Sequence, residues 1–106
     1  MMNNLNSILI EGTLVCDAVQ GESSTTLTIA NNRYVKTEEG FEKETYFFRV
    51  ETYGKLANAC LKYAKKDRGC RVVGRLVQDS CERIFINAEH VEFRPVFTKE
   101  EKGGKL

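Results

Sequence analysis

Residues 44–57 carry the side chains of this sequence that are best suited to binding chemistry, Glu-Thr-Tyr-Phe-Phe-Arg-Val-Glu-Thr-Tyr-Gly-Lys-Leu-Ala. The first ten are rich in aromatic and β-branched residues, which favour a strand, and alternate side chains of a strand share a face. One face would carry Phe47, Arg49 and Tyr53 together with Glu51. Because an unpaired arginine is costly to bury, this face suits the surface, where rings can stack on unpaired bases and a cation can hold their backbone. The alternative is that Phe47 and Tyr53 are core residues and Arg49 is a solvated neighbour.

Charge is distributed unevenly along the chain, although the net charge is only +1. Residues 1–52 hold four basic against eight acidic residues, residues 53–75 seven against one, and residues 76–106 five against six. A cationic middle segment indicates a path for a polyanion. The alternative is a helix with a solvated lysine face around Lys62.

The 106 residues, of which 42% are apolar, suffice for one domain with a hydrophobic core. No apolar run approaches the ~20 residues of a membrane span, and Ile8-Leu9-Ile10 is too short for the core of a signal peptide. A cytoplasmic protein is therefore expected. The four cysteines, at positions 16, 60, 70 and 81, are expected to be unbridged, and their spacing does not indicate a zinc site, so no metal is predicted.

Motifs for catalysis or cofactor binding are absent from the sequence. Neither Gly-rich phosphate loop, G-x-x-x-x-G-K-S/T or G-x-G-x-x-G, occurs in it. The single histidine, His90, falls in a predicted strand and is a poor candidate for a general base. The chain is therefore expected to be neither an enzyme nor the carrier of a cofactor.

Five strands and one helix account for most of the periodicity. The strands are predicted at residues 6–15, 25–30, 44–53, 70–78 and 83–93, and the helix at 55–66, with Gly69 as its C-terminal stop. The connections are polar turns at 17–24 and 79–82 and a hairpin tip at 37–43, centred on Gly40. Gly12, inside the first strand, marks either a bulge or a bend where another backbone approaches closely. The pattern predicts one domain at residues 1–97 and a disordered tail at 98–106.

The order of these elements predicts the fold. Three strands, a helix and two further strands follow one another in the oligonucleotide-binding (OB) fold. The sequence therefore predicts an all-β protein, a five-stranded Greek-key β-barrel with one short helix.

Four segments of the sequence stand in an order that matches a known family. They are Asn6-x-Ile8-x-Ile10-x-Gly12-x-Leu14, Phe47-Phe48-Arg49-Val50 through Tyr53-Gly54-Lys55-Leu56-Ala57, Val73-Gly74-Arg75-Leu76 followed by Gln78-Asp79, and Ala88-Glu89-His90-Val91-Glu92-Phe93-Arg94-Pro95. Over residues 6–95 the chain resembles the bacterial single-stranded DNA-binding protein family. The resemblance implies an OB fold and sequence-independent binding of single-stranded DNA in replication, recombination or repair, associated with the nucleoid.

The resemblance also implies which residues bind DNA. The family's stacking rings fall on Phe47 and Tyr53, with a further ring at Tyr34, and its basic contacts fall on Arg49 and Lys55. Charge adds five weaker candidates to these, namely Arg33, Lys36, Lys62, Arg71 and Arg75.

Self-association is a second implication of the resemblance, since the family usually forms homotetramers; a dimer is the other possibility. The residues offer a modest reason of their own. Tyr46 and Phe48, on the second face of the strand at 44–53, add with Ile8 and Ile10 more apolar surface than a small barrel interior needs. The alternative is that all four belong to the core.

Several positions depart from the family's pattern. Tryptophan is absent, Cys81 stands where one is expected, the basic residues usual along 77–80 are missing, and the long hairpin there is reduced to a turn. Asp17-Ala18 replaces the usual Asp-Pro. The chain ends in Gly-Gly-Lys-Leu rather than in an acidic, aromatic tip, so recruitment of repair and replication enzymes is not expected. Fewer rings and phosphate contacts predict a compact member with weaker binding and a flatter salt dependence.

A second hypothesis is that the chain has the same barrel fold but a function other than DNA binding. The missing basic residues after Arg75 and the acidic loop at 38–44 favour a protein-interaction module, such as a primosome-type accessory subunit with weakened DNA affinity. RNA binding of the cold-shock type is disfavoured, because the aromatic and Gly-rich strand pattern of that family is absent.

Overall fold

The computed structural model describes residues 1–95, which form six strands and one helix. The elements are β1 (Ile8–Leu14), β2 (Val19–Gln20), β3 (Thr25–Thr37), β4 (Gly40–Thr52), α1 (Gly54–Tyr63), β5 (Gly69–Gln78) and β6 (Ile84–Phe93). The predicted tail at 98–106 and the last two residues of the predicted domain lie outside the described residues. Within residues 1–95, no helix is long and apolar enough to cross a membrane.

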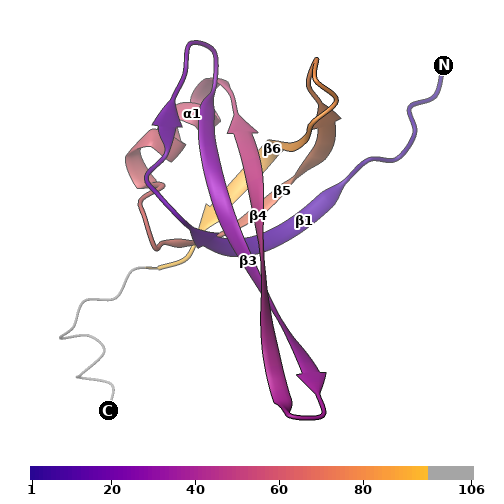
Figure 1. Ribbon diagram of the computed structural model, residues 1–106. Coiled ribbons are helices and arrows are strands. Elements are labelled where there is room, and N and C mark those ends of the chain that lie inside the picture. The colour runs from indigo at the N-terminus through magenta and orange to yellow at the C-terminus, as the bar shows by residue number, and fades with distance from the viewer. Residues whose placement is uncertain (96–106) are drawn as a thin grey trace.

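The strands close into a barrel (Figure 1). They hydrogen-bond in the order β1-β5-β6-β4-β3-β2, and β1 also pairs with β3, so the five long strands make a complete circuit. All pairs are antiparallel except β4 and β6, which run parallel. The predicted five-stranded OB barrel with one short helix is confirmed. The two-residue strand β2, inside the predicted turn at 17–24, adds only a short edge to β3.

The barrel interior is filled by aliphatic side chains that alternate along the strands. The fully buried ones include Leu14, Leu27, Ile29, Val50 and Val72. Cys60 of helix α1 and Ala64, the residue directly after the helix, belong to this cluster. The helix lies at the end of the barrel away from the tip of the β3–β4 hairpin (Figure 1). The period-two alternation of the strands therefore decides which side chains form the core.

Two predicted boundaries of the helix differ from the structure. Helix α1 ends at Tyr63 rather than at residue 66, and Gly69 is not its stop but the first residue of β5. The chain after β1 accounts for the early end, because Ala18 N donates to Ala64 O at 2.9 Å and Asp17 Oδ1 accepts from Lys66 N at 2.8 Å. These contacts satisfy backbone groups that another helical turn would otherwise use. The left-handed residue beyond the helix is Asp67, with φ 71°.

The largest difference from the predicted elements is the length of the β3–β4 hairpin. The second strand was predicted at 25–30 and the third at 44–53, but β3 continues to Thr37 and β4 begins at Gly40. Cross-strand pairing runs without interruption from Thr25↔Thr52 to Thr37↔Gly40. The ribbon satisfies its own backbone groups, so polar residues can occupy both faces where it leaves the barrel. Figure 1 shows this part as an arm that projects well beyond the other strands.

Gly12 lies where β1 crosses β3, which is the close backbone approach given above as one of two possibilities for this residue. A Cβ atom at Gly12 would overlap Cγ2 of Ile29 and the carbonyl oxygen of Ala30. At this crossing β1 pairs with β3 only through Thr13↔Ala30 and Leu14↔Ile29. Closure of the barrel therefore depends on a residue without a side chain at position 12.

We expect Gly12→Ala to lower the free energy of unfolding by about 1–3 kcal/mol, because the added methyl group can fit only if backbone moves. Thermal unfolding followed by circular dichroism measures the effect. Thr13→Ala, at the exposed neighbouring position, is the control and should unfold close to the wild type. Equal melting temperatures for the two variants would contradict the close crossing.

The four cysteines divide into two buried and two exposed thiols, and all four are unbridged. Burial raises the pKa of Cys70 to about 11 and also raises the pKa of Cys60. We expect a thiol reagent at pH 8 to modify Cys16 and Cys81 in the native protein and all four in denaturant, since the thiolate is the reactive form. Rapid modification of all four native thiols would mean that the core opens readily.

Candidate nucleic-acid interface

The two faces of the arm follow from the register of β3 and β4. Leu27 and Ile29 point into the core, so the even-numbered residues of β3 point outward, together with their odd-numbered partners on β4. We call the part of this surface beyond the closed barrel the outer arm face. It consists of Ala30, Asn32, Tyr34 and Lys36 from β3 and Phe41, Lys43, Thr45 and Phe47 from β4.

Three aromatic rings are displayed on the outer arm face. Phe41 is 73% exposed, and Tyr34 and Phe47 are each 65% exposed. Tyr34 lies directly opposite Lys43 in the ladder, and Phe41 opposite Lys36. The interior position proposed as the alternative for Phe47 is therefore excluded.

The charge of the outer arm face is positive. It holds Lys36 and Lys43 and no carboxylate, because Glu42 and Glu44 belong to the opposite face and Glu38 to the turn. Thr45 Oγ1 donates to Asn32 Oδ1 at 2.8 Å, which fixes two polar side chains between the rings. Cations that alternate with exposed rings suit the backbone and the bases of an unpaired strand.

Arg33, a candidate by charge like Lys36, does not share the face of Tyr34 and Lys36. It belongs to the opposite face of the arm and lies across the ladder from Glu44. Glu44 in turn accepts a hydrogen bond from the Tyr46 hydroxyl at 2.7 Å. This face mixes one cation with two carboxylates and is less suited to phosphate.

Arg49 points outward, as the alternation of its strand predicted, but its charge is already shared. Its Nε lies 3.4 Å from Glu51 Oε2, and its Nη2 lies 3.6 Å from Asp79 Oδ2. The guanidinium also sits 4.4 Å from the centre of the Phe85 ring. Arg49 is therefore held by three neighbours from three segments of the chain.

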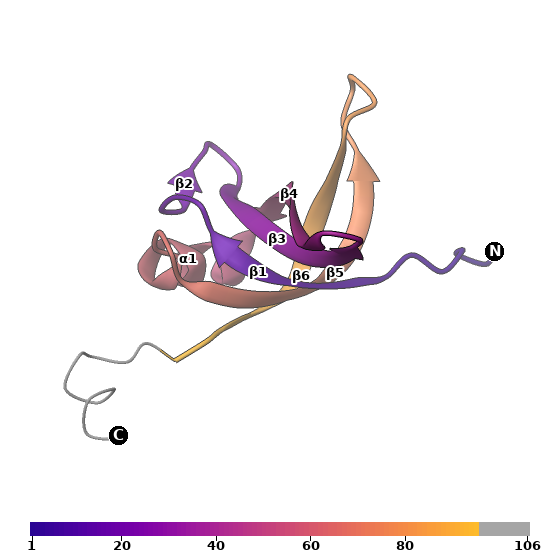
Figure 2. The same ribbon diagram turned by 60° about the horizontal axis from the view of Figure 1, so that its bottom comes forward.

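An open groove of about 450 Å³ begins beside Arg49, between β4 and the β5–β6 hairpin. It exists because β4 pairs with β6 only at Val50↔Ile86 and Glu51↔Asn87, after which the two hairpins leave the barrel in different directions (Figures 1 and 2). The lining residues are Phe47, Phe48, Arg49, Leu76, Ile84, Phe85 and Ile86. Phe48 is thus partly exposed, although its neighbour Val50 is buried, because Phe48 lies where the interior opens.

Tyr53, Lys55 and Lys62 form a separate group at α1. Tyr53 is the N-cap residue of the helix, is 44% exposed and follows Phe47 by about 20 Å of extended chain. Lys55 is exposed in the first turn of the helix, and Lys62 in the last turn lies 5.4 Å from the Tyr63 ring. Tyr53 and Lys55 follow directly on the end of β4 that is farther along the chain from the arm.

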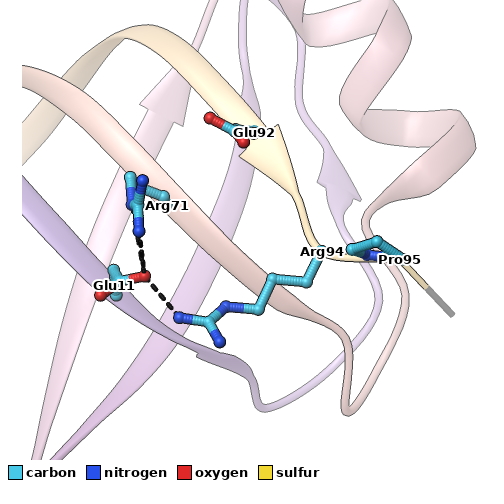
Figure 3. Close-up of a pocket in the computed structure, with 5 residues that line it drawn as sticks. All are labelled: Glu11, Arg71, Glu92, Arg94 and Pro95. Carbon is cyan, nitrogen blue, oxygen red and sulfur yellow. Dashed lines mark hydrogen bonds and ion pairs between the residues drawn. The ribbon is translucent and has the colours of Figure 1, made fainter.

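Arg71 belongs to a third place, on the outside of β1, β5 and β6. Its Nη2 and Nε donate to Glu11 Oε2 at 2.9 and 3.2 Å, and Arg94 donates to the same oxygen (Figure 3). These hydrogen bonds hold the pKa of Glu11 below its usual value. The cluster lines an open pocket of about 380 Å³ with Glu92 and Pro95. Arg71 therefore joins strands through an ion pair and does not meet the rings of the arm.

Arg75 is exposed on β5 opposite Asn87, and no ion pair with it is found among residues 1–95. The same described part of the chain contains no group of three or more His, Cys, Asp or Glu side chains that could hold a metal ion.

Three residues with suitable chemistry were not among the sequence-based candidates, namely Phe41, Lys43 and Phe85. Phe41 and Lys43 share the odd-numbered alternation of Phe47 and Arg49. Beginning the strand at Gly40 instead of residue 44 would have brought both into the same set. For Phe85 there was no local signal, because its place beside Arg49 depends on the pairing of β4 with β6.

Proteins of known structure share this fold. A Plasmodium falciparum single-stranded DNA-binding protein, solved with single-stranded DNA, superposes with a TM-score of 0.72 at 18% identity, covering 90% of this chain and 99% of that one. The small single-stranded DNA-binding protein from Streptomyces coelicolor gives a TM-score of 0.72 at 19% identity, covering 88% of this chain and 96% of the other. At these identities the likeness establishes the OB fold.

Two relatives have a higher sequence identity to this chain than the proteins of known structure described above. A single-stranded DNA-binding protein from Aquifex aeolicus is 35% identical over 85 residues, covering 74% of this chain and 58% of the relative. Single-stranded DNA-binding protein 1 from Chlorobaculum tepidum is 32% identical over 82 residues, covering 72% of this chain and 51% of the relative. The chain thus spans little more than half the length of these relatives. Residues 5–92 match the family model described as the single-strand binding protein family, so the chain belongs to that family.

Proposed function

We propose that this protein binds single-stranded DNA without sequence preference, as a non-catalytic component of replication, recombination or repair in the cytoplasm. The observation that carries the proposal is the outer arm face, where Tyr34, Phe41 and Phe47 are exposed and Lys36 and Lys43 lie among them. Rings accept any base, because every base has a π-face, and lysines contact the phosphates between bases. The family to which the chain belongs supports the same ligand.

The proposed path of the single-stranded DNA runs along β4. It begins at the rings of the arm, passes Arg49 and the groove beside Phe85, and ends at Tyr53 and Lys55 on α1. Lys62 and Arg75 are proposed as outlying phosphate contacts. Arg33 and Arg71 are weaker candidates, because one shares its face with two glutamates and the other is held by Glu11.

Assembly into a homotetramer, or a dimer, is part of the proposal. β1 pairs with β5 along Ile8–Thr13 but with β3 only at Thr13 and Leu14, so residues 8–12 have no strand partner on that edge among the described residues. Leu9 on this strand is 66% exposed. An unpaired edge and an exposed leucine support association between copies.

The test of the function is titration of a fluorescently labelled oligo-dT with the full chain, at about 50 mM salt and above. We expect binding that weakens as salt rises and a much weaker affinity for duplex of the same length. Light scattering with and without oligo-dT gives the oligomeric state in the same buffers.

A protein-interaction module remains the second candidate, because Arg49 and Arg71 are paired internally and the groove exposes Ile84 and Leu76. A stable oligomer with no oligo-dT complex at low salt would select it and reject DNA binding.

We expect Phe41→Ala and Phe47→Ala each to weaken oligo-dT binding by about 1–3 kcal/mol, the loss of one stacked base. Fluorescence anisotropy titrations measure the affinities. Tyr46→Ala is the matched control, since Tyr46 is an exposed ring on the opposite face of the same strand, and it should change the affinity little. If Tyr46→Ala weakens binding as much as Phe47→Ala does, the outer arm face is not the stacking surface.

A further inference from the structure

Arg49 lies between two carboxylates that differ in how they are held. Glu51 is the more buried, with a side chain 12% exposed against 29% for Asp79. Thr26 Oγ1 lies 2.8 and 2.9 Å from Glu51 Oε1 and Oε2 and donates its one hydrogen to this carboxylate, and Ser24 Oγ donates to Oε1 at 2.8 Å. Glu51 is therefore a fixed acceptor that orients the Nε side of the guanidinium.

Asp79 approaches the same guanidinium from the β5–β6 turn. Its Oδ1 accepts the backbone N–H groups of Cys81 and Arg83 at 2.8 and 3.0 Å, which leaves Oδ2 directed at Arg49 Nη2. The N–H groups of Arg83 and Cys81, with the charge of Arg49, hold the pKa of Asp79 below its usual value. Asp79 is thus an ionised group at neutral pH whose position is set by the turn.

The Nη2 atom that faces Asp79 belongs to the part of Arg49 that a DNA phosphate would contact. Nε is turned toward Glu51, and one face of the guanidinium lies on Phe85. A guanidinium has five N–H donors, so one that is held through Nε can still grip a phosphate through its terminal nitrogens. Asp79 carries the same charge as the phosphate and is directed at one of those nitrogens.

We propose that Asp79 competes with DNA phosphate for Arg49, while Glu51 and Phe85 keep the guanidinium in place. Asp79 is then a residue that sets the affinity and the salt dependence of the interface, although it touches no base. The inference rests on the proposed binding of single-stranded DNA and identifies a charge within the fold that limits it.

The test compares Asp79→Asn with Glu82→Gln. Asparagine keeps a side-chain oxygen for the N–H groups of Cys81 and Arg83, so the turn should persist, and circular dichroism melting confirms that it does. Glu82→Gln removes one negative charge from the same turn, and no ion pair with Glu82 is found within residues 1–95. The two variants therefore differ in the contact with Arg49 and not in net charge.

We expect Asp79→Asn to bind oligo-dT roughly two- to fivefold more tightly than the wild type, the range of an exposed charge pair. The slope of log K against log salt should steepen by about 0.7, the value for one more phosphate contact on a single strand. Glu82→Gln should raise the affinity clearly less and leave the slope of log K against log salt unchanged. In a protein that already carries Arg49→Gln, Asp79→Asn should raise the affinity for oligo-dT no more than Glu82→Gln does.

The outcomes separate this inference from the proposed function. If Asp79→Asn and Glu82→Gln change the affinity for oligo-dT equally, Asp79 does not compete with phosphate for Arg49. The same conclusion follows if Asp79→Asn still raises the affinity in the Arg49→Gln protein. Either result would leave the proposed DNA binding intact. Absence of oligo-dT binding by every variant at low salt would reject the function and the inference together. Binding by Asp79→Asn where the wild type shows none would support competition in its strongest form.

Discussion

The continuous ladder between β3 and β4 is the constraint on which the rest of the molecule depends. At one end of it Leu27 and Val50 are paired and buried, and at the other Lys36 and Phe41 are paired and exposed. Because the side-chain period of a strand is two, a shift of one residue would turn the core residues outward and the rings of the arm to the opposite face. The same register therefore determines the stability of the barrel and the composition of its proposed binding surface.

Pairing of charges within the fold divides the basic residues into two kinds. Arg49 and Arg71 are held by carboxylates, whereas no ion pair involves Lys36 or Lys43 among the described residues. Exposed ion pairs contribute little to stability, so their main effect is on which cations can meet a phosphate without displacing a partner. Lys36 and Lys43 can therefore meet a phosphate directly, whereas Arg49 and Arg71 already face a carboxylate.

The shape of the proposed interface comes from two hairpins that diverge. Parallel pairing of β4 with β6 is limited to two positions, and beyond them the arm and the β5–β6 hairpin separate (Figures 1 and 2). The divergence opens the groove and brings Asp79 and Phe85 to Arg49. The β5–β6 hairpin thus contributes a ring from β6 and a carboxylate from its short turn, where the family's pattern has a longer basic hairpin.

The sequence by itself determined the fold class, through the order of its elements, and the shared face of Phe47 and Arg49, through local alternation. It left open whether that face points outward and whether Gly12 marks a bulge or a close crossing of two strands. It could not determine the length of the arm, since polar residues at 31–36 suit a loop as well as a ribbon exposed on both faces. Nor could it determine that Asp79 and Phe85 meet Arg49. Those contacts join segments far apart in the chain, and only closure of the barrel brings them within a few ångströms of one another.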